Sequence, residues 1–346
     1  MKNIFAIQIK NDDTVKALFT KFDLNDDYKI TEHDNIFRAV NAYEKEITDE
    51  TEIVIVSDGF LESEKDIILS ALNKYGIRNK PTYIDYRESF INYNIGFTKL
   101  TNYHNVGLIF QREDNLVLFY AKFDKKIGLS VKIEDRIFEN IGYENLTLEE
   151  KDNRLFELLP DVLDDSIDIL YLTTNAFSGG YMRKSLELMC RDRRVFLEEN
   201  LLILGGYAYI KNTYSANVEI SIRSKYTSPI NVSFDVKTLD GLQTVEVVNF
   251  DTRMYNDISP IDIITYDESF IEFNVSGKLE KKIKICIAHL VRGINKPTRL
   301  RISPLFSEDL QLFSLSVQDI GFGAFVKPTY MQVKQIISLD DRRCYE

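Results

Sequence analysis

The 346-residue sequence has no tryptophan and only three cysteines. Because Cys190, Cys286 and Cys344 lie far apart, they fit neither a disulfide framework nor a zinc site, and they favour a reducing cytoplasm. No segment approaches the roughly 18 uninterrupted apolar residues that a membrane-spanning helix needs. The short apolar run at the beginning is broken by Gln8 and Lys10, which argues against a signal peptide. We therefore expect a cytoplasmic protein without membrane insertion.

Positive charge is also scarce, with 43 Lys and Arg residues against 54 Asp and Glu residues and a net charge of -11. Nucleic-acid binding requires clustered Lys and Arg to neutralise phosphates, so no nucleic-acid partner is expected. Hydrophobic residues make up 44% and aromatic residues 12% of the chain, which is enough to bury sizeable cores. The length suits two domains.

Strand and helix patterns alternate from residue 4 to residue 210. The run at 51–60, TEIVIVSDGF, is rich in β-branched residues and predicts a strand buried on both faces. The segment 61–77 predicts a helix that Gly76 ends. The remaining predictions are strands at 4–10, 15–23 and 28–34, a helix at 35–47, a short strand and helix within 78–97, three strands within 105–135, a helix at 153–163, a strand at 166–177, a helix at 179–192, and a strand followed by two glycines at 200–210.

The pattern changes near Tyr214. From there to residue 328, apolar and polar residues alternate with a period of two, and turn residues recur at regular intervals. This pattern predicts a separate antiparallel β-sandwich domain at 214–328. The segment 329–346 is predicted to be a peripheral C-terminal tail.

The order of elements in residues 1–213 resembles the Hsp70/actin/sugar-kinase superfold, in which each of two lobes begins with three antiparallel strands. The resemblance rests on the strand-loop-helix at 53–77, the strand and helix at 82–97, the hairpin at 106–123, and the glycine pairs in IDILYLTTNAFSGGYMRKSLELM and LLILGGYAYI. It implies an α/β, ribonuclease H-like two-lobed core, with lobes at 1–105 and 106–213, followed by the β-sandwich. The whole chain also resembles a group of bacterial Hsp70-like proteins of unknown function, which share stretches similar to NKPTRLRI and QDIGFGAF.

An ATPase of this superfold needs an acidic residue at the end of its first strand and a glycine in the following turn. Here the resemblance places Gln8 at the acidic position and Lys10 at the glycine position, while Asp12, Asp13 and Thr14 follow. In the second phosphate loop the glycine, Gly107, comes too early, and bulky residues follow it. ATP hydrolysis is therefore not expected, unless Asp12 or Asp13 replaces the missing acid.

The adenosine region resembles the superfold more closely. No cofactor is expected, with weak ATP or ADP binding as the alternative. Helix packing alone would also explain a glycine pair between a strand and a helix, such as Gly179 and Gly180. The resemblance implies nucleotide-binding roles for Gly179, Gly180, Arg183, Gly205, Gly206, Asp12 and Thr14. No catalytic residue and no metal ligand are predicted.

Two further motifs each have two interpretations. Asp23–Asp34, DLNDDYKITEHD, matches the first acidic positions of an EF-hand loop, but Tyr28 stands where the loop needs glycine. We interpret it as the turn between the second and third strands, with calcium binding as the alternative. In NKPTRLRI, Arg299 and Arg301 lie on one face of a predicted strand near Lys296, and these residues form either a partner-binding stripe or a solvated strand face.

Three functions remain open from the sequence. The first is a non-catalytic pseudo-ATPase that serves as a scaffold or binds protein partners. The second is an ATP-binding chaperone or ATPase, and the third is an actin-like component that self-associates through its lobes.

Overall fold

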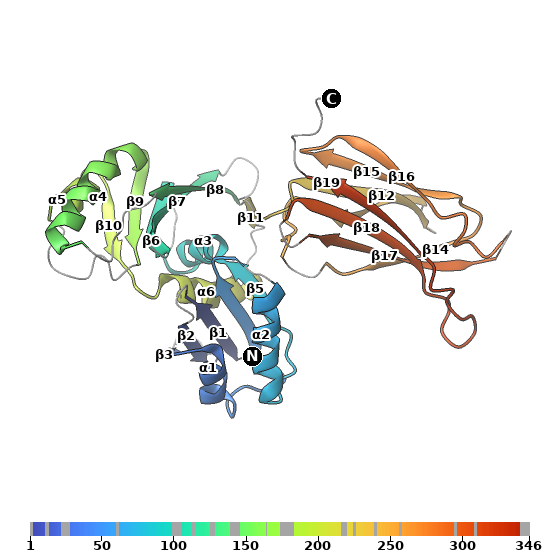
Figure 1. Cartoon of the computed structure of the whole chain (residues 1–346), viewed down its shortest axis with the longest axis horizontal. Coiled ribbons are helices and arrows are strands. Elements are labelled where there is room, and N and C mark those ends of the chain that lie inside the picture. The colour runs from blue at the N-terminus through green and yellow to red at the C-terminus, as the bar shows by residue number, and fades with distance from the viewer. Residues whose placement is uncertain are drawn as a thin grey trace. The chain divides into compact units, whose positions relative to one another are not determined.

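The computed structural model (Figure 1) divides by its internal contacts into two units, Met1–Ser224 and Lys225–Glu346, and each is described by itself. The residues described are 3–10, 14–21, 28–59, 62–98, 105–112, 115–124, 129–138, 146–163, 165–173, 183–215, 220–223, 226–238, 241–255, 258–293, 296–307 and 310–339. Within these residues, no helix is long and apolar enough to cross a membrane.

The first sheet of unit 1 has the strand order β3-β2-β1-β4-β5. Its first three strands form an antiparallel meander, and β4 and β5 continue parallel to β1. The strands are β1 (Ile4–Ile9), β2 (Val15–Thr20), β3 (Tyr28–His33), β4 (Glu52–Ser57) and β5 (Thr82–Asp85). Residues 28–33 of the acidic stretch 23–34 form β3, which pairs with β2. An EF-hand loop would instead lie between two helices. Asp23 and its neighbours up to Asp27 lie outside the described residues.

Helices cover both faces of this sheet. Side chains on successive strand residues point to opposite faces, so each face packs against its own helices. On one face, Phe5 and Phe19 contact Tyr43 of α1 (Ile36–Tyr43). On the other face, Ala6 and Val54 belong to the core shared with α3 (Tyr86–Phe97) and α6 (Leu201–Ser215). The predicted helix at 61–77 is α2 (Glu62–Lys74), which also packs with α1.

The second sheet repeats the order of the first. Its strands run β8-β7-β6-β9-β10, which matches β3-β2-β1-β4-β5, and β11 is added beside β8. The strands are β6 (Asn105–Arg112), β7 (Asn115–Asp124), β8 (Leu129–Phe138), β9 (Ile167–Leu172), β10 (Arg194–Leu197) and β11 (Ile220–Arg223), and the helices are α4 (Leu148–Val162) and α5 (Arg183–Met189). This duplicated topology confirms the predicted ribonuclease H-like, actin-like core. Because β11 pairs with β8, unit 1 extends past residue 213, where the second lobe was expected to end.

The segment 200–210 differs from its prediction as a strand, because it lies within α6. Four successive apolar residues, 201–204, imitate a buried strand in the sequence. In the structure they are all buried, together with Tyr207 and Ala208, between core side chains of both sheets. A helix buried on every side has no amphipathic period, so its pattern cannot be distinguished from that of a strand.

Unit 2 is the predicted antiparallel β-sandwich. One sheet has the order β13-β12-β15-β16 and the other β14-β17-β18-β19. The strands are β12 (Ile230–Thr238), β13 (Gly241–Val248), β14 (Ile261–Thr265), β15 (Phe270–Gly277), β16 (Lys281–Cys286), β17 (Thr298–Phe306), β18 (Leu312–Asp319) and β19 (Gln332–Ser338). One apolar core spans both sheets. The segment expected to be a peripheral tail contains β19, which pairs with β18 from Leu312 to Gln318.

Candidate functional site

Three polar side chains form a row across the first sheet at the carboxyl end of β1. Gln8 lies opposite Lys16, and Lys16 lies opposite Glu32, so all three point to the face that α6 covers. Ligands of α/β sheets bind outside the carboxyl ends of parallel strands. This row therefore occupies the edge where a nucleotide would approach in an actin-like fold.

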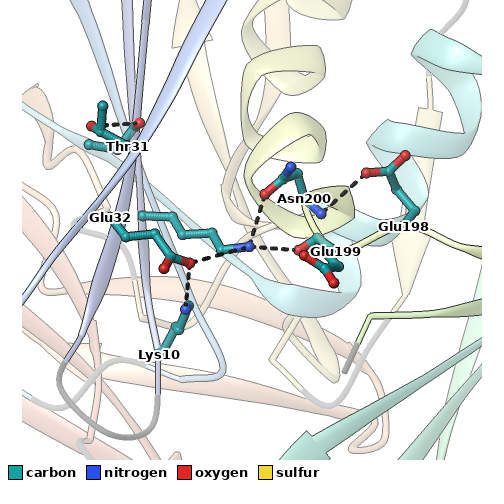
Figure 2. Close-up of polar contacts among 8 residues, drawn as sticks. Lys10, Thr31, Glu32, Glu198, Glu199 and Asn200 are labelled. Carbon is teal, nitrogen blue, oxygen red and sulfur yellow. Dashed lines mark hydrogen bonds and ion pairs between the residues drawn. The ribbon is translucent and has the colours of Figure 1, made fainter. Parts of the chain in front are cut away.

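Lys16 is the centre of this row and is only 8% exposed. Its Nζ donates to the Glu199 carbonyl at 3.0 Å and to Asn200 Oδ1 at 2.9 Å, and it lies 3.7 Å from Glu32 Oε1 (Figure 2). Burial lowers the pKa of Lys16, and the nearby Lys10 adds to this effect, while Glu32 and Glu199 oppose it. The ammonium group thus fastens β2 to the residues that begin α6.

Glu32 and Asn200 complete the network at its two ends. Glu32 also pairs with Lys10 at 3.0 Å, and this hydrogen bond is the main cause of its lowered pKa. The Asn200 carbonyl accepts from Leu204 N in the first turn of α6, and the Asn200 N–H donates to Glu198. Figure 2 shows Lys10 and Glu32 on the strand side and Glu198, Glu199 and Asn200 at the start of the helix.

Gln8 stands at the position where the resemblance implies the magnesium-positioning acid. Its side chain is neutral and the residue is only 7% exposed. Within the described part of the chain, its Oε1 has no hydrogen-bond partner. A buried amide cannot supply the negative charge that binds Mg²⁺ in this superfold.

A second group of charges surrounds the start of α3. Asp85 caps this helix by accepting from Glu88 N at 2.8 Å, and it is fully buried. Burial, with a smaller contribution from Glu88, raises the pKa of Asp85 to about 7, while Arg87 opposes the shift. The Tyr86 hydroxyl donates to the Ile9 carbonyl at 2.6 Å, which ties the helix to the end of β1.

Arg87 connects the two sheets of unit 1. Its guanidinium donates to both carboxylate oxygens of Asp135 on β8, one bond measuring 2.7 Å, and it lies 3.7 Å from Asp58 after β4. It also stacks on Phe119 of β7, 4.6 Å from the ring centre. Among the described residues, the carboxyl groups of Asp58, Asp85 and Asp135 all act on Arg87, and Glu88 acts on Asp85.

Only some of the predicted nucleotide-binding residues lie within the part of the chain that the structure describes. Gly179, Gly180 and Asp12 lie outside the described residues, and Arg183 is the first residue of α5, with only its backbone described. Thr14 precedes β2, and its carbonyl accepts from Lys10 N at 2.9 Å. Their binding roles stay predictions.

Gly205 and Gly206 lie inside α6, where close packing accounts for them. A Cβ on Gly205 would come within 2.0 Å of the Ser89 carbonyl oxygen, and one on Gly206 within 2.6 Å of Val56. Glycine therefore lets α6 approach α3 and the first sheet. Close helix packing thus accounts for this pair in the structure, and its nucleotide-binding role stays a prediction.

Arg299 and Arg301 share the outer face of β17, as their spacing predicted. Both contact Asp262 on β14, Arg301 through two bonds of 2.8 and 3.0 Å and Arg299 through one of 2.8 Å. Lys296 is exposed just before this strand. The partner-binding role of the three residues stays a prediction.

Sequence reasoning missed the buried charges of unit 1, in particular Lys16, Asp58, Arg87 and Asp135. A signal was present for Lys16, which interrupts the largely apolar strand VKALFT. The partners of these charged residues are distant in the sequence, so the spacing of residues could not identify them.

Known proteins offer only a likeness of fold. The comparison with curated proteins found no match. A Bacteroides thetaiotaomicron protein described as having an actin-like ATPase fold and unknown function is 11% identical, covering 61% of this chain and 96% of its own, with a TM-score of 0.35. The ethanolamine utilization protein EutJ from Carboxydothermus hydrogenoformans is 6% identical, covering 60% and 90%, with a TM-score of 0.38. A non-polymerisable pCBH ParM mutant is 12% identical, covering 61% and 100%, with a TM-score of 0.39.

Family models divide the chain as its internal contacts do. Residues 227–339 match a domain of unknown function, DUF8552. Residues 36–222, more than half of the chain, match the C-terminal part of a family of unknown function, DUF5716. The boundary between the matches brackets the division at Ser224–Lys225. The chain therefore belongs to the DUF5716 family.

Proposed function

We propose that the protein is a non-catalytic module of the actin-like fold that serves as a scaffold or binds protein partners in the cytoplasm. The observation that carries this proposal is the environment of Lys16. Its ammonium group is buried and donates hydrogen bonds to the Glu199 carbonyl and to Asn200. These groups of the chain itself occupy the cation, which is therefore not available to bind a phosphate.

Two neighbouring features support the proposal. Gln8 supplies an uncharged amide where the superfold needs an acid for Mg²⁺. Arg87 is paired with Asp135 and lies near Asp58, so this cation too is neutralised within the chain. Electrostatic stabilisation of phosphoryl transfer needs cations aimed at the phosphates. Lys16 and Arg87 are instead bonded to groups of the chain itself.

A titration of the full chain with ATP, with and without Mg²⁺, tests the proposal by calorimetry. We expect no saturable binding tighter than about 1 mM. Magnesium-dependent binding in the micromolar range would overturn it in favour of the ATP-binding alternative. The variant Lys16→Met then locates any nucleotide, since binding at this row would weaken in the variant and binding near Arg183 would not.

Self-association through the lobes is tested separately. Sedimentation velocity over a wide range of protein concentration is expected to give the mass of one chain throughout. A mass that grows with concentration would favour the self-assembling alternative. Such growth would argue against a scaffold that acts as a single chain.

A further inference from the structure

Two stretches of unit 2 meet around one hollow. NKPTRLRI supplies β17, and QDIGFGAF supplies the end of β18 and the loop after it, with Ile320 N donating to the Arg299 carbonyl at 3.0 Å. A surface hollow of about 390 Å³ lies there. It is lined by Asp262, Ile263, Ile264, Arg299 and Phe322. Apolar, aromatic and cationic groups thus converge on one side of the sandwich.

Hydrogen bonds to Asp319 fix the conformation of the loop that carries Phe322. This buried carboxylate accepts from Gly321 N at 3.0 Å, from Thr329 N at 2.9 Å and from Arg292. Gly321 has a φ of 62°, and a Cβ there would lie 2.3 Å from the Val326 carbonyl oxygen, so only glycine fits. A fixed loop can present a side chain for binding without a large entropic cost.

The face of β17 beside the hollow carries two cations around one carboxylate, in a chain whose net charge is -11. Two guanidinium groups, those of Arg299 and Arg301, share the single carboxylate of Asp262. Their side chains are 42% and 43% exposed, and three of their ten N–H donors bind Asp262. A second carboxylate could therefore bind in the two-pronged geometry that arginine favours.

The hollow also adjoins an edge of the sheet that no other strand covers within the residues that the structure describes. β14 is the outermost strand of its sheet, so alternate backbone N–H and C=O groups point away from β17. Natural proteins protect such edges with lysine, and the edge strand β16 carries Lys281, Lys282 and Lys284. The sequence of β14, IDIIT, contains no lysine, and its Ile264 is 56% exposed. An unprotected edge beside a pocket is the arrangement used for strand addition.

We propose that the edge of β14 and this hollow bind an extended segment of an acidic partner protein. The segment would pair with the β14 backbone, place a carboxylate at Arg299 and place an apolar side chain against Ile264 and Phe322. This inference rests on the proposed partner-binding function, but it does not depend on whether unit 1 binds nucleotide.

A displayed library of random peptides, each about ten residues long and so able to span the five residues of β14, provides the probe. Selection on the full chain is expected to enrich peptides that combine Asp or Glu with apolar residues in alternation. A synthetic enriched peptide should lose about tenfold in affinity with Arg299→Gln, and a similar amount with Ile264→Lys.

Leu305→Lys is the matched control, because Leu305 is a 62% exposed aliphatic residue on the same sheet, away from β14. It should leave the affinity unchanged, and thermal unfolding should show that all variants fold. If Ile264→Lys does not fold, Ile264→Thr replaces it, since a polar side chain of similar shape also removes the apolar contact.

Three results would overturn the inference: no enriched peptide class, enrichment of basic peptides, or equal losses with Leu305→Lys and Ile264→Lys. A concentration-dependent dimer that Ile264→Lys abolishes would also overturn it, because the edge would then bind a second copy of this chain. A chain that binds these peptides and also Mg-ATP would overturn the non-catalytic function alone. A chain that binds neither would overturn this inference alone.

Discussion

Two cations of unit 1 and two of unit 2 lie in opposite environments. In unit 1, Lys16 and Arg87 are buried and bonded to groups of the chain itself. In unit 2, Arg299 and Arg301 are about two-fifths exposed and share one carboxylate. A buried cation must be satisfied within the fold, because an unpaired one carries a large desolvation cost. An exposed cation contributes little to stability and stays available to a partner. The difference predicts large effects on folding in unit 1 and small ones in unit 2.

The largest effect is expected for Arg87→Met. This substitution leaves the Asp135 carboxylate, which is only 16% exposed, without its guanidinium partner and removes the link between the two sheets. Breaking such a buried pair costs about 3–5 kcal/mol. Calorimetric unfolding should show the loss in the transition of unit 1, with the transition of unit 2 unchanged. A loss below about 1 kcal/mol, as for a surface pair, would remove the contrast between the units.

Gly205→Ala is expected to cost about 3 kcal/mol, near the upper end for overpacking, because the added methyl group meets the backbone at Ser89. Its control is Gly107→Ala, where a Cβ would meet only the ends of side chains such as that of Leu170, which can move aside. Urea unfolding of both variants measures the difference. Equal losses would mean that α6 can shift as easily as a side chain, against the close packing of α3 and α6.

Asp85→Asn should change how stability depends on pH. The pKa of Asp85 is about 7 in the folded chain, against about 4 in an unfolded one, so the native state binds more protons between these values. Stability contributed by the protonated form is therefore present below about pH 4 and is lost as pH rises to 7. The amide keeps the helix cap without a charge, and should raise stability above pH 7 by about 1–2 kcal/mol.

Melting temperatures measured from pH 4 to pH 8 test this expectation. The wild-type curve should fall toward neutral pH more steeply than that of the variant. Parallel curves would show that Asp85 keeps an ordinary pKa. Glu88→Gln is a useful companion variant, because removing the neighbouring carboxyl should lower the pKa of Asp85 and flatten the curve in part.

The order of elements could be predicted from the sequence because most strands and helices have one buried and one exposed face. Such elements show a periodic pattern of apolar residues. The alternation in unit 2 predicted a sandwich, and the strand-helix order of unit 1 predicted its duplicated sheets. The helix α6 could not be predicted, since residues buried on all sides show no period. The polar contacts of Lys16 and Arg87 could not be predicted from the sequence either. Lys16 and Asn200 are 184 residues apart and Arg87 and Asp135 are 48 apart, and only the folded topology brings each pair together.

The smallest effect on folding is expected for Arg301→Gln in unit 2. Its bonds to Asp262 lie at the surface, where an ion pair contributes about 0–1 kcal/mol, and Arg299 continues to neutralise the carboxylate. The lowered pKa of Asp262, which is caused chiefly by its hydrogen bond to Arg301, should move back toward its ordinary value. NMR titration of the Asp262 carboxyl measures that shift, and chemical unfolding measures stability. A loss as large as that of Arg87→Met would mean that Arg301 supports the fold, and its charge would then not be free for an acidic partner.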